Sequence, residues 1–194
     1  MSYKDRKVLA YLIGIALGDG NLSNPNGRAI RLRITCDARY TQLAEEISRS
    51  IGILLPKNKI SIVRVPSRTT FFNISVYSNR LAVWLPWRVG KGTKLYQKAH
   101  VPTWIRENLP FSRECLRGLL QTDGSIYRDR GYLMVNFTNH TKPLADDVYT
   151  MIKKIGYEPT FTSTPIPARD NMKYTVRVAR NAEKFIQDIR LTKS

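Results

Sequence analysis

The sequence predicts an α+β protein built from two related halves, each with the element order α-β-β-α-β-β-α. Two observations favour this fold class. A nine-residue segment at residues 12–20 recurs at residues 116–124, and the stretches after each copy show the same succession of helical and strand periodicities. Equivalent aspartates of the two copies, Asp19 and Asp123, lie 104 residues apart. We therefore expect two repeats related by pseudo-twofold symmetry, with antiparallel sheets.

The elements of the first half follow from their apolar periodicity. A helix is expected at about residues 6–18 and an alternating strand at 30–35. A second helix at about 39–51 places Leu43, Ala44, Ile47 and Ile51 on one face. Strands at about 59–65 and 70–77 and a short helix at 79–87 complete this half, with a short strand expected directly after Asp19-Gly20.

The second half repeats this order at nearly constant offset. Helices are expected at 111–122, 143–155 and 181–190, and strands at 132–138, 159–164 and 172–179, with a short strand after Asp123-Gly124. Residues 90–110 contain glycine, proline and lysines, which is typical of a connecting segment. We therefore divide the chain into an N-terminal half at residues 1–89, a linker at 90–110 and a C-terminal half at 111–194.

Composition narrows the classes of partner. Lys and Arg total 32 against 15 Asp and Glu, giving a net charge of +17 and a pI near 10.2. Such an excess usually indicates a polyanionic partner, with nucleic acid ahead of an anionic membrane surface, although a generally cationic soluble protein has the same charge. The longest apolar stretch, at residues 9–17, is too short to span a membrane. With no signal-peptide pattern either, we expect an intracellular protein, in a prokaryotic cytoplasm or an organelle.

Cysteine and histidine are too scarce for several kinds of site. The chain has two cysteines, Cys36 and Cys115, and two histidines. These numbers exclude a disulfide framework and argue against a zinc finger or a histidine-centred nuclease. Both cysteines are most simply interpreted as buried, reduced side chains.

The repeated segment predicts that two helices pack closely and bring their terminal aspartates together. Gly14 and Gly18 are four residues apart, as are Gly118 and Thr122, so each helix presents one face of small residues on which a partner helix can pack closely. Parallel packing would bring Asp19 and Asp123 together at the negative C-terminal ends of both helices. That concentration of negative charge favours a hard divalent cation, which prefers oxygen ligands and can assist phosphodiester hydrolysis.

Residues 12–20 and 116–124 resemble the two copies of the LAGLIDADG motif, and the repeat covers nearly the whole chain. The resemblance implies a monomeric, single-chain homing endonuclease, a site-specific enzyme that cuts both strands of DNA. The genetic element can be an intron or an intein, and a chain of this size suits an intron-encoded product. It implies that Asp19 and Asp123 are catalytic and bind Mg²⁺, with Mn²⁺ able to substitute. The main-chain carbonyls of Gly18 and Thr122 would also help to bind the metal. The expected partner is double-stranded DNA with a long target site, read by a saddle of sheets, without an obligatory protein partner.

The motif departs from the family pattern at its first acidic position, which is Leu17 in one copy and Gln121 in the other. The last aspartate, which binds the metal in the family, is retained in both copies and favours cleavage. An RNA-binding intron maturase that assists splicing without cutting DNA is the alternative, followed by a regulator that only binds DNA.

DNA-reading surfaces are expected on the polar faces of the strands. Period-two alternation would point one polar set of side chains into the major groove, although any antiparallel sheet with a solvated face alternates in this way. The candidates are Arg31, Arg33, Thr35, Asn73, Ser75, Tyr77, Asn136, Thr138, Lys173, Thr175 and Arg177, with Thr160, Thr162 and Thr164 on a fifth strand. Phosphate contacts are expected from Arg28, Lys91, Lys94, Lys98, Arg128 and Arg130.

Groups around the metals are expected from two further places. Cys36 and Asn139 end the strand that follows each motif, where an amide could order a water; a thiol is a poorer substitute. The resemblance also implies a basic, charge-stabilising residue after the last strand or short helix of each half. The candidates are Arg88, Lys91 or Lys94 in the first half and Arg180 in the second, and ordinary phosphate or solvent contacts explain these residues equally well.

Overall fold

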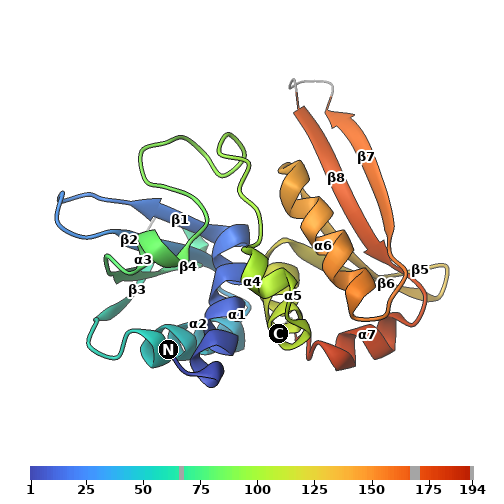
Figure 1. Cartoon of the computed structure of the whole chain (residues 1–194), viewed down its shortest axis with the longest axis horizontal. Coiled ribbons are helices and arrows are strands. Elements are labelled where there is room, and N and C mark those ends of the chain that lie inside the picture. Colours follow the sequence, from blue (N-terminus) through green and yellow to red (C-terminus); the bar gives the residue numbers. More distant parts are fainter. Residues whose placement is uncertain (66–67, 167–170, 193–194) are drawn as a thin grey trace.

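The computed structural model describes residues 1–65, 68–166 and 171–192, which form two halves on either side of a central pair of helices (Figure 1). The first half contains α1 (Tyr3–Asp19), β1 (Gly20–Ser23), β2 (Arg31–Asp37), α2 (Thr41–Leu54), β3 (Ile60–Val65), β4 (Arg68–Tyr77) and α3 (Leu81–Trp84). The second half contains α5 (Leu109–Asp123), β5 (Gly124–Asp129), β6 (Tyr132–Asn139), α6 (Lys142–Lys154), β7 (Thr160–Ile166), β8 (Asn171–Val178) and α7 (Ala182–Asp188). A short helix, α4 (Thr103–Arg106), lies between them.

The sheets confirm the two-repeat architecture. Each has four antiparallel strands, in the orders β1-β2-β4-β3 and β5-β6-β8-β7. Gly20 pairs with Ile34 in the first sheet, and Gly124 pairs with Phe137 in the second. Cys36 and Asn139 therefore hold equivalent places, each two residues beyond the partner of the motif glycine.

The helices after β4 differ from the sequence-based expectation. The helix expected at 79–87 is reduced to α3, followed by Leu85 in extended conformation. At the other end of the linker, α5 starts before residue 111. Asn108 is its N-cap and accepts a hydrogen bond from the Phe111 amide (3.3 Å), and Pro110 occupies the first turn, where its missing N–H costs nothing.

The helices α1 and α5 lie side by side and in parallel at the centre of the molecule (Figure 1). Residues 9–17 of α1 are all buried, so this helix is surrounded by protein on every side. A Cβ added to Gly14 would lie 2.3 Å from the Cys115 carbonyl oxygen, and one added to Gly118 would lie 2.5 Å from the Tyr11 carbonyl oxygen. The backbones therefore touch directly, and a larger side chain at either glycine would separate the helices.

The glycine that ends each motif does not have the left-handed backbone with which glycine commonly ends a helix. Gly20 (φ −79°, ψ 143°) and Gly124 (φ −90°, ψ 159°) are extended, a conformation open to any residue. Their need for glycine is steric. A Cβ would lie 2.5 Å from the Ala16 carbonyl oxygen in the first case and 2.2 Å from the Leu120 carbonyl oxygen in the second. Each glycine lets the chain turn from helix to strand against the last helical turn.

Polar bonds also join the two halves. On α5, Arg117 forms ion pairs with Glu46 of α2 and with Glu114 (2.7 Å), and its guanidinium lies over the Tyr11 ring of α1 (4.1 Å). In the linker, the Val101 amide donates to the Asp147 carboxylate of α6 (2.7 Å). In the described part of the chain no helix is long and apolar enough to cross a membrane.

The contact between α1 and α5 predicts a large effect of one methyl group. Gly14→Ala forces a Cβ into the Cys115 carbonyl, and we expect it to lower the free energy of unfolding by about 3 kcal/mol, the scale of core overpacking. Gly52→Ala in α2 is the matched control, because its Cβ would meet only the Ile60 side chain at 3.9 Å. That change should stabilise the protein by up to about 1 kcal/mol. Equal urea-unfolding curves for the two variants would contradict the close packing.

Candidate active site at the ends of the central helices

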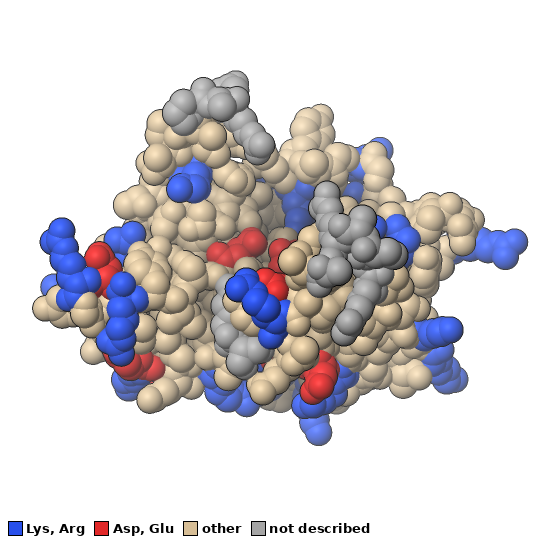
Figure 2. Space-filling model, turned by 180° about the vertical axis from the view of Figure 1, so that it is seen from behind, with Lys and Arg blue, Asp and Glu red and all other residues tan. Residues whose placement is uncertain are grey.

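The two motif aspartates are the last residues of the central helices. Asp19 ends α1 and Asp123 ends α5. Just before them the helices are in contact, since a Cβ on Gly18 would lie 2.6 Å from the Thr122 Cβ. The two carboxylates therefore belong to neighbouring helix ends. Seen from behind, acidic side chains lie in a hollow near the middle of the molecule, with basic side chains around it (Figure 2).

Lys94 of the linker reaches this site from above the end of α1. Its ammonium donates hydrogen bonds to the carbonyls of Ala16 (3.2 Å), Leu17 (2.6 Å) and Gly18, and lies 5.5 Å from the centre of the Trp87 ring. Burial lowers the pKa of Lys94, while the charges of Asp123 and Asp19 oppose that shift. The Lys94 amino group thus lies at the negative end of α1, close enough to Asp123 and Asp19 to interact with both carboxylates.

The Asp123 carboxylate is hydrogen-bonded to Asn139 at the end of β6. The Asn139 side-chain amide donates to the Asp123 carboxylate (2.6 Å), and its carbonyl oxygen accepts from the Thr141 main-chain amide (2.8 Å). The Thr141 bond fixes which way the amide faces, so its NH₂ group points at the acid. In this arrangement Asn139 contacts the acid directly.

The equivalent residue of the first half is Cys36, which is 3% exposed. Burial raises the pKa of its thiol to about 12, and the nearby charge of Asp19 adds to the shift. The thiol is therefore neutral near pH 7 and a weak hydrogen-bonding group. The two equivalent strand positions thus differ, with an amide at Asp123 and a neutral thiol near Asp19, while the Lys94 ammonium interacts with both acids.

A pocket of about 230 Å³ opens beside Asp19. Its lining includes Cys36 and Arg39 from the first half and Gln121 and Thr122 from the second. At roughly 30 Å³ per molecule, this polar space can hold several waters. Both halves thus shape the surroundings of the first acid.

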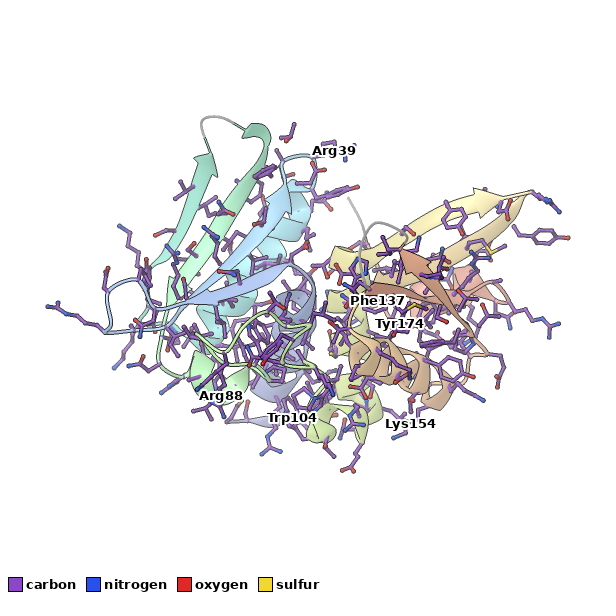
Figure 3. All side chains as sticks on the ribbon, turned by 90° about the horizontal axis from the view of Figure 1, so that it is seen from above. Arg39, Arg88, Trp104, Phe137, Lys154 and Tyr174 are labelled. Carbon is purple, nitrogen blue, oxygen red and sulfur yellow. The ribbon has the colours of Figure 1, made fainter. Side chains whose placement is uncertain are left out.

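Of the four basic candidates, only Lys94 contacts the helix ends. Arg88 donates to the Ala82 carbonyl (2.5 Å) and lies on the side of the first half opposite Arg39 (Figure 3). Lys91 is exposed on the linker. Arg180 is exposed beyond the end of β8, where Val178 pairs with Val135, whereas Asn139 pairs with Tyr174 at the other end of the strand pair.

The ligand atoms at this site fit a divalent ion whose remaining ligands are water and substrate phosphate. Among the residues that the structure describes, no three His, Cys, Asp or Glu side chains come together. The site contains two carboxylates and the main-chain carbonyls next to them. The Lys94 amino group already lies beside these oxygens, so the site can accommodate positive charge. Mg²⁺ is commonly bound by one or two carboxylates with waters and substrate phosphates, which matches this sparse set.

The polar faces of the strands point away from the cores. In β2 and β4 the buried residues alternate with the candidate base-reading residues, and Arg33 pairs with Ser75 while Thr35 pairs with Asn73. In the second sheet Asn136 pairs with Arg177, and Thr138 with Thr175, on the same kind of open face. The candidates on the neighbouring strands continue these rows: Arg31 with Tyr77, Thr160 with Arg177, Thr162 with Thr175 and Thr164 with Lys173.

Several of these side chains are already hydrogen-bonded to each other. Thr35 donates to Asn73 (2.9 Å), Arg177 donates to Asn136 (3.0 Å) and Arg31 donates to Ser23 (3.0 Å). Such bonds hold the polar side chains in defined positions on the sheet face. The candidates for phosphate contacts, Arg28, Lys98, Arg128 and Arg130, are all exposed, and Arg128 lies in β5 and not in a loop.

Two residues near the acids did not emerge as candidates from the sequence. Arg39 lines the pocket beside Asp19 and is paired with Asp37 (2.7 Å). Gln121, which was noted only as a departure from the motif, is buried; its amide donates to Glu46 (3.2 Å) and to the Thr192 carbonyl (3.1 Å). Arg39 follows the strand that ends near Cys36, which is the one signal that could have indicated it.

Comparison with known proteins agrees with this architecture. Residues 110–190 match the family model of the LAGLIDADG-like domain. Over the whole chain, the fold matches the homing endonuclease I-DmoI, solved as a variant with its target DNA in the presence of Mg. The TM-score is 0.71 at 20% identity, covering 98% of this chain and 99% of that one. Residues 110–190 thus form a LAGLIDADG-like domain, and the whole chain shares the fold of I-DmoI.

Other matches extend the range of relatives sharing this fold. I-DmoI in complex with DNA and Ca gives a TM-score of 0.68 at 22% identity, covering 95% of this chain and 90% of that one. The N-terminal LAGLIDADG domain of DUF199/WhiA gives 0.64 at 13% identity, covering 97% and 85%. At these identities the similarity shows a shared fold.

Two curated relatives contain a similar stretch within much longer chains. The tRNA-splicing ligase RtcB of Methanopyrus kandleri is 26% identical over 96% of this chain, which spans 21% of that protein. The replication factor C small subunit of Methanocaldococcus jannaschii is 29% identical over 64% of this chain, which spans 7% of that protein.

Proposed function

We propose that the chain is a site-specific endonuclease that hydrolyses both strands of DNA with divalent metal bound by Asp19 and Asp123. The observation that carries the proposal is the place of these carboxylates. They end two helices in direct backbone contact, between two sheets whose polar faces are open, in a protein of net charge +17. The similarity to I-DmoI, whose complexes hold DNA with Ca, Mn or Mg, supports it.

Each part of the site has a role in this proposal. Asp19 and Asp123, with the carbonyls of Gly18 and Thr122, would hold Mg²⁺, or Mn²⁺ in its place. The metal supplies charge that lowers the pKa of water and stabilises the leaving oxygen. Asn139 would orient the Asp123 carboxylate, and the pocket beside Asp19, lined in part by Thr122 and Gln121, offers space for water. Lys94 places positive charge where a phosphate would lie between the acids.

The sheets and loops would divide DNA recognition between them. Side chains on the open strand faces are suited to base edges in the major groove, as Arg pairs with guanine and Asn with adenine. Exposed arginines and lysines in the loops are suited to phosphates, which position the duplex without reading it. With both motifs in one chain, we propose that the protein acts as a monomer, without an obligatory protein partner, on a long duplex target.

The genetic setting belongs to the same proposal. We propose an intron-encoded protein, and the curated relatives show that similar segments also occur inside longer polypeptides. Retention of both carboxylates favours DNA cleavage over a maturase role without cleavage, because RNA binding alone does not call for two acids at the centre of a basic surface.

Removing one carboxylate charge tests the proposed chemistry. Asp19→Asn and Asp123→Asn are each expected to bind DNA as the wild type does and to lose double-strand cleavage in Mg²⁺ by roughly a hundredfold or more, because metal-ion stabilisation is worth several kcal/mol. The substrate is a duplex recovered by selecting cleaved members of a randomised library. Asp146→Asn on α6, whose carboxylate is paired with Lys142, is the matched control and should cut normally. Normal cutting by either motif variant would refute the assignment.

Replacing an arginine of the sheet and an arginine of a loop should change DNA recognition in different ways. Arg33→Ala removes an open-face side chain, so the selected library should lose base preference at one position by about 1–3 kcal/mol. Arg28→Ala removes an exposed loop charge, so it should weaken binding to all sequences and reduce the salt slope by about 1. Loss of base preference in the loop variant alone would reverse these roles.

A further inference from the structure

The linker carries Lys94 on a single helical turn. In this turn the Gln97 main-chain amide donates to the Thr93 carbonyl (3.0 Å). Lys94 and Gln97 are three residues apart, so their side chains leave the turn on the same face. The Lys94 amino group lies beside the end of α1 and interacts with Asp123 and Asp19. Its place at the acids therefore depends on how this turn is held.

The Gln97 side chain ties the turn to the start of the loop. Its carbonyl oxygen accepts a hydrogen bond from the Arg88 main-chain amide (2.8 Å), and its NH₂ group donates to the carbonyls of Arg88 (2.9 Å) and Gly92 (2.9 Å). All three bonds are made to the main chain, across nine residues in one direction and five in the other. One side chain thus closes the loop of residues 88–97.

The main chain that Gln97 holds adjoins another contact of Lys94. Trp87, directly before Arg88, is buried, and the centre of its ring lies 5.5 Å from the Lys94 nitrogen. Arg88 and Gly92 are exposed, so water can replace Gln97 as the partner of their main-chain groups. Loss of the Gln97 bonds would therefore free the turn without opening the core.

We propose that Gln97 is a positioning residue that holds the Lys94 amino group over the ends of the central helices. The inference rests on the proposed function, in which Lys94 places positive charge where a phosphate would lie. The side-chain bonds of Gln97 are to the linker, so Gln97 acts through Lys94. A lysine side chain is flexible, and a charge contributes to a reaction only when it is held close to the reacting group.

Chemical labelling measures the place of Lys94 without depending on cleavage. In the wild type the Lys94 amino group is bonded to three main-chain carbonyls of α1 and should react slowly with acetic anhydride, as followed by mass spectrometry of its peptide. Gln97→Met removes the three side-chain bonds, and Gln97→Glu keeps the acceptor but removes both donors. Both variants should label Lys94 about tenfold faster or more, because a loosened loop opens more often. Lys57, which is exposed outside the linker, should label at an unchanged rate.

Cleavage kinetics distinguish positioning from a general loss of stability. On the duplex selected from the library, Gln97→Met should lower kcat in Mg²⁺ by roughly tenfold to a hundredfold, the cost of misplacing a group by about 1 Å, and should leave KM nearly unchanged. In a Lys94→Met background the same change should cost less than about twofold, because the group that Gln97 positions is gone. Gln187→Met, an exposed change on α7, should cut as its parent does in both backgrounds.

The outcomes separate this inference from the function on which it rests. Unchanged labelling of Lys94 in both Gln97 variants, or equal losses of kcat in the two backgrounds, overturns the inference. If the wild type cuts no member of the library while labelling changes as expected, the proposed endonuclease function fails and the placement of Lys94 by Gln97 stands. If the wild type and Lys94→Met cut equally well, Lys94 has no part in cleavage and Gln97 is not a positioning residue for the reaction.

Discussion

Direct backbone contact between α1 and α5 determines where the two aspartates and the two sheets of this protein lie. Gly14 and Gly118 allow it, because a Cβ at either position would strike a carbonyl of the other helix. Close parallel helices end at the same level, which brings the aspartates at their ends together. The turn at Gly20 or Gly124 then starts each sheet from that same place, so the sheets extend from the acids on both sides.

This packing gathers negative charge, and the surrounding residues interact with it. Lys94 covers the end of α1 and interacts with both acids, and the Asn139 amide donates to Asp123. Away from the acids, the ion pair between Arg117 and Glu46 ties α5 to the other half of the molecule. Two repeats with the same topology thus place different residues, Cys36 and Asn139, at equivalent strand positions near the acids.

Most of the fold could be predicted from the sequence because the chain contains two related repeats. The recurrence of residues 12–20 at 116–124 and the matching periodicities gave the two-repeat architecture, which the sheet orders confirm. Local pattern was less informative about Gly20 and Gly124, whose glycine is required by a clash with the preceding turn and not by a left-handed backbone.

The surroundings of the acids were harder to predict, for a physical reason. Sequence position made Arg88, Lys91 and Lys94 equal candidates, and only the path of the linker over the end of α1 separates them. Arg39 and Gln121 likewise line the pocket beside Asp19 through tertiary packing between the halves. Spacing along a chain determines which face of a helix a residue occupies, but not which distant segment lies against it.

We propose that helix packing places two acids where two strands of DNA can be cut. Anomalous scattering from Mn²⁺ in crystals of the protein with its cleavable duplex tests this placement. We expect metal beside both Asp19 and Asp123, between the protein and the DNA backbone. Metal bound elsewhere, or acids that face away from the duplex, would contradict it.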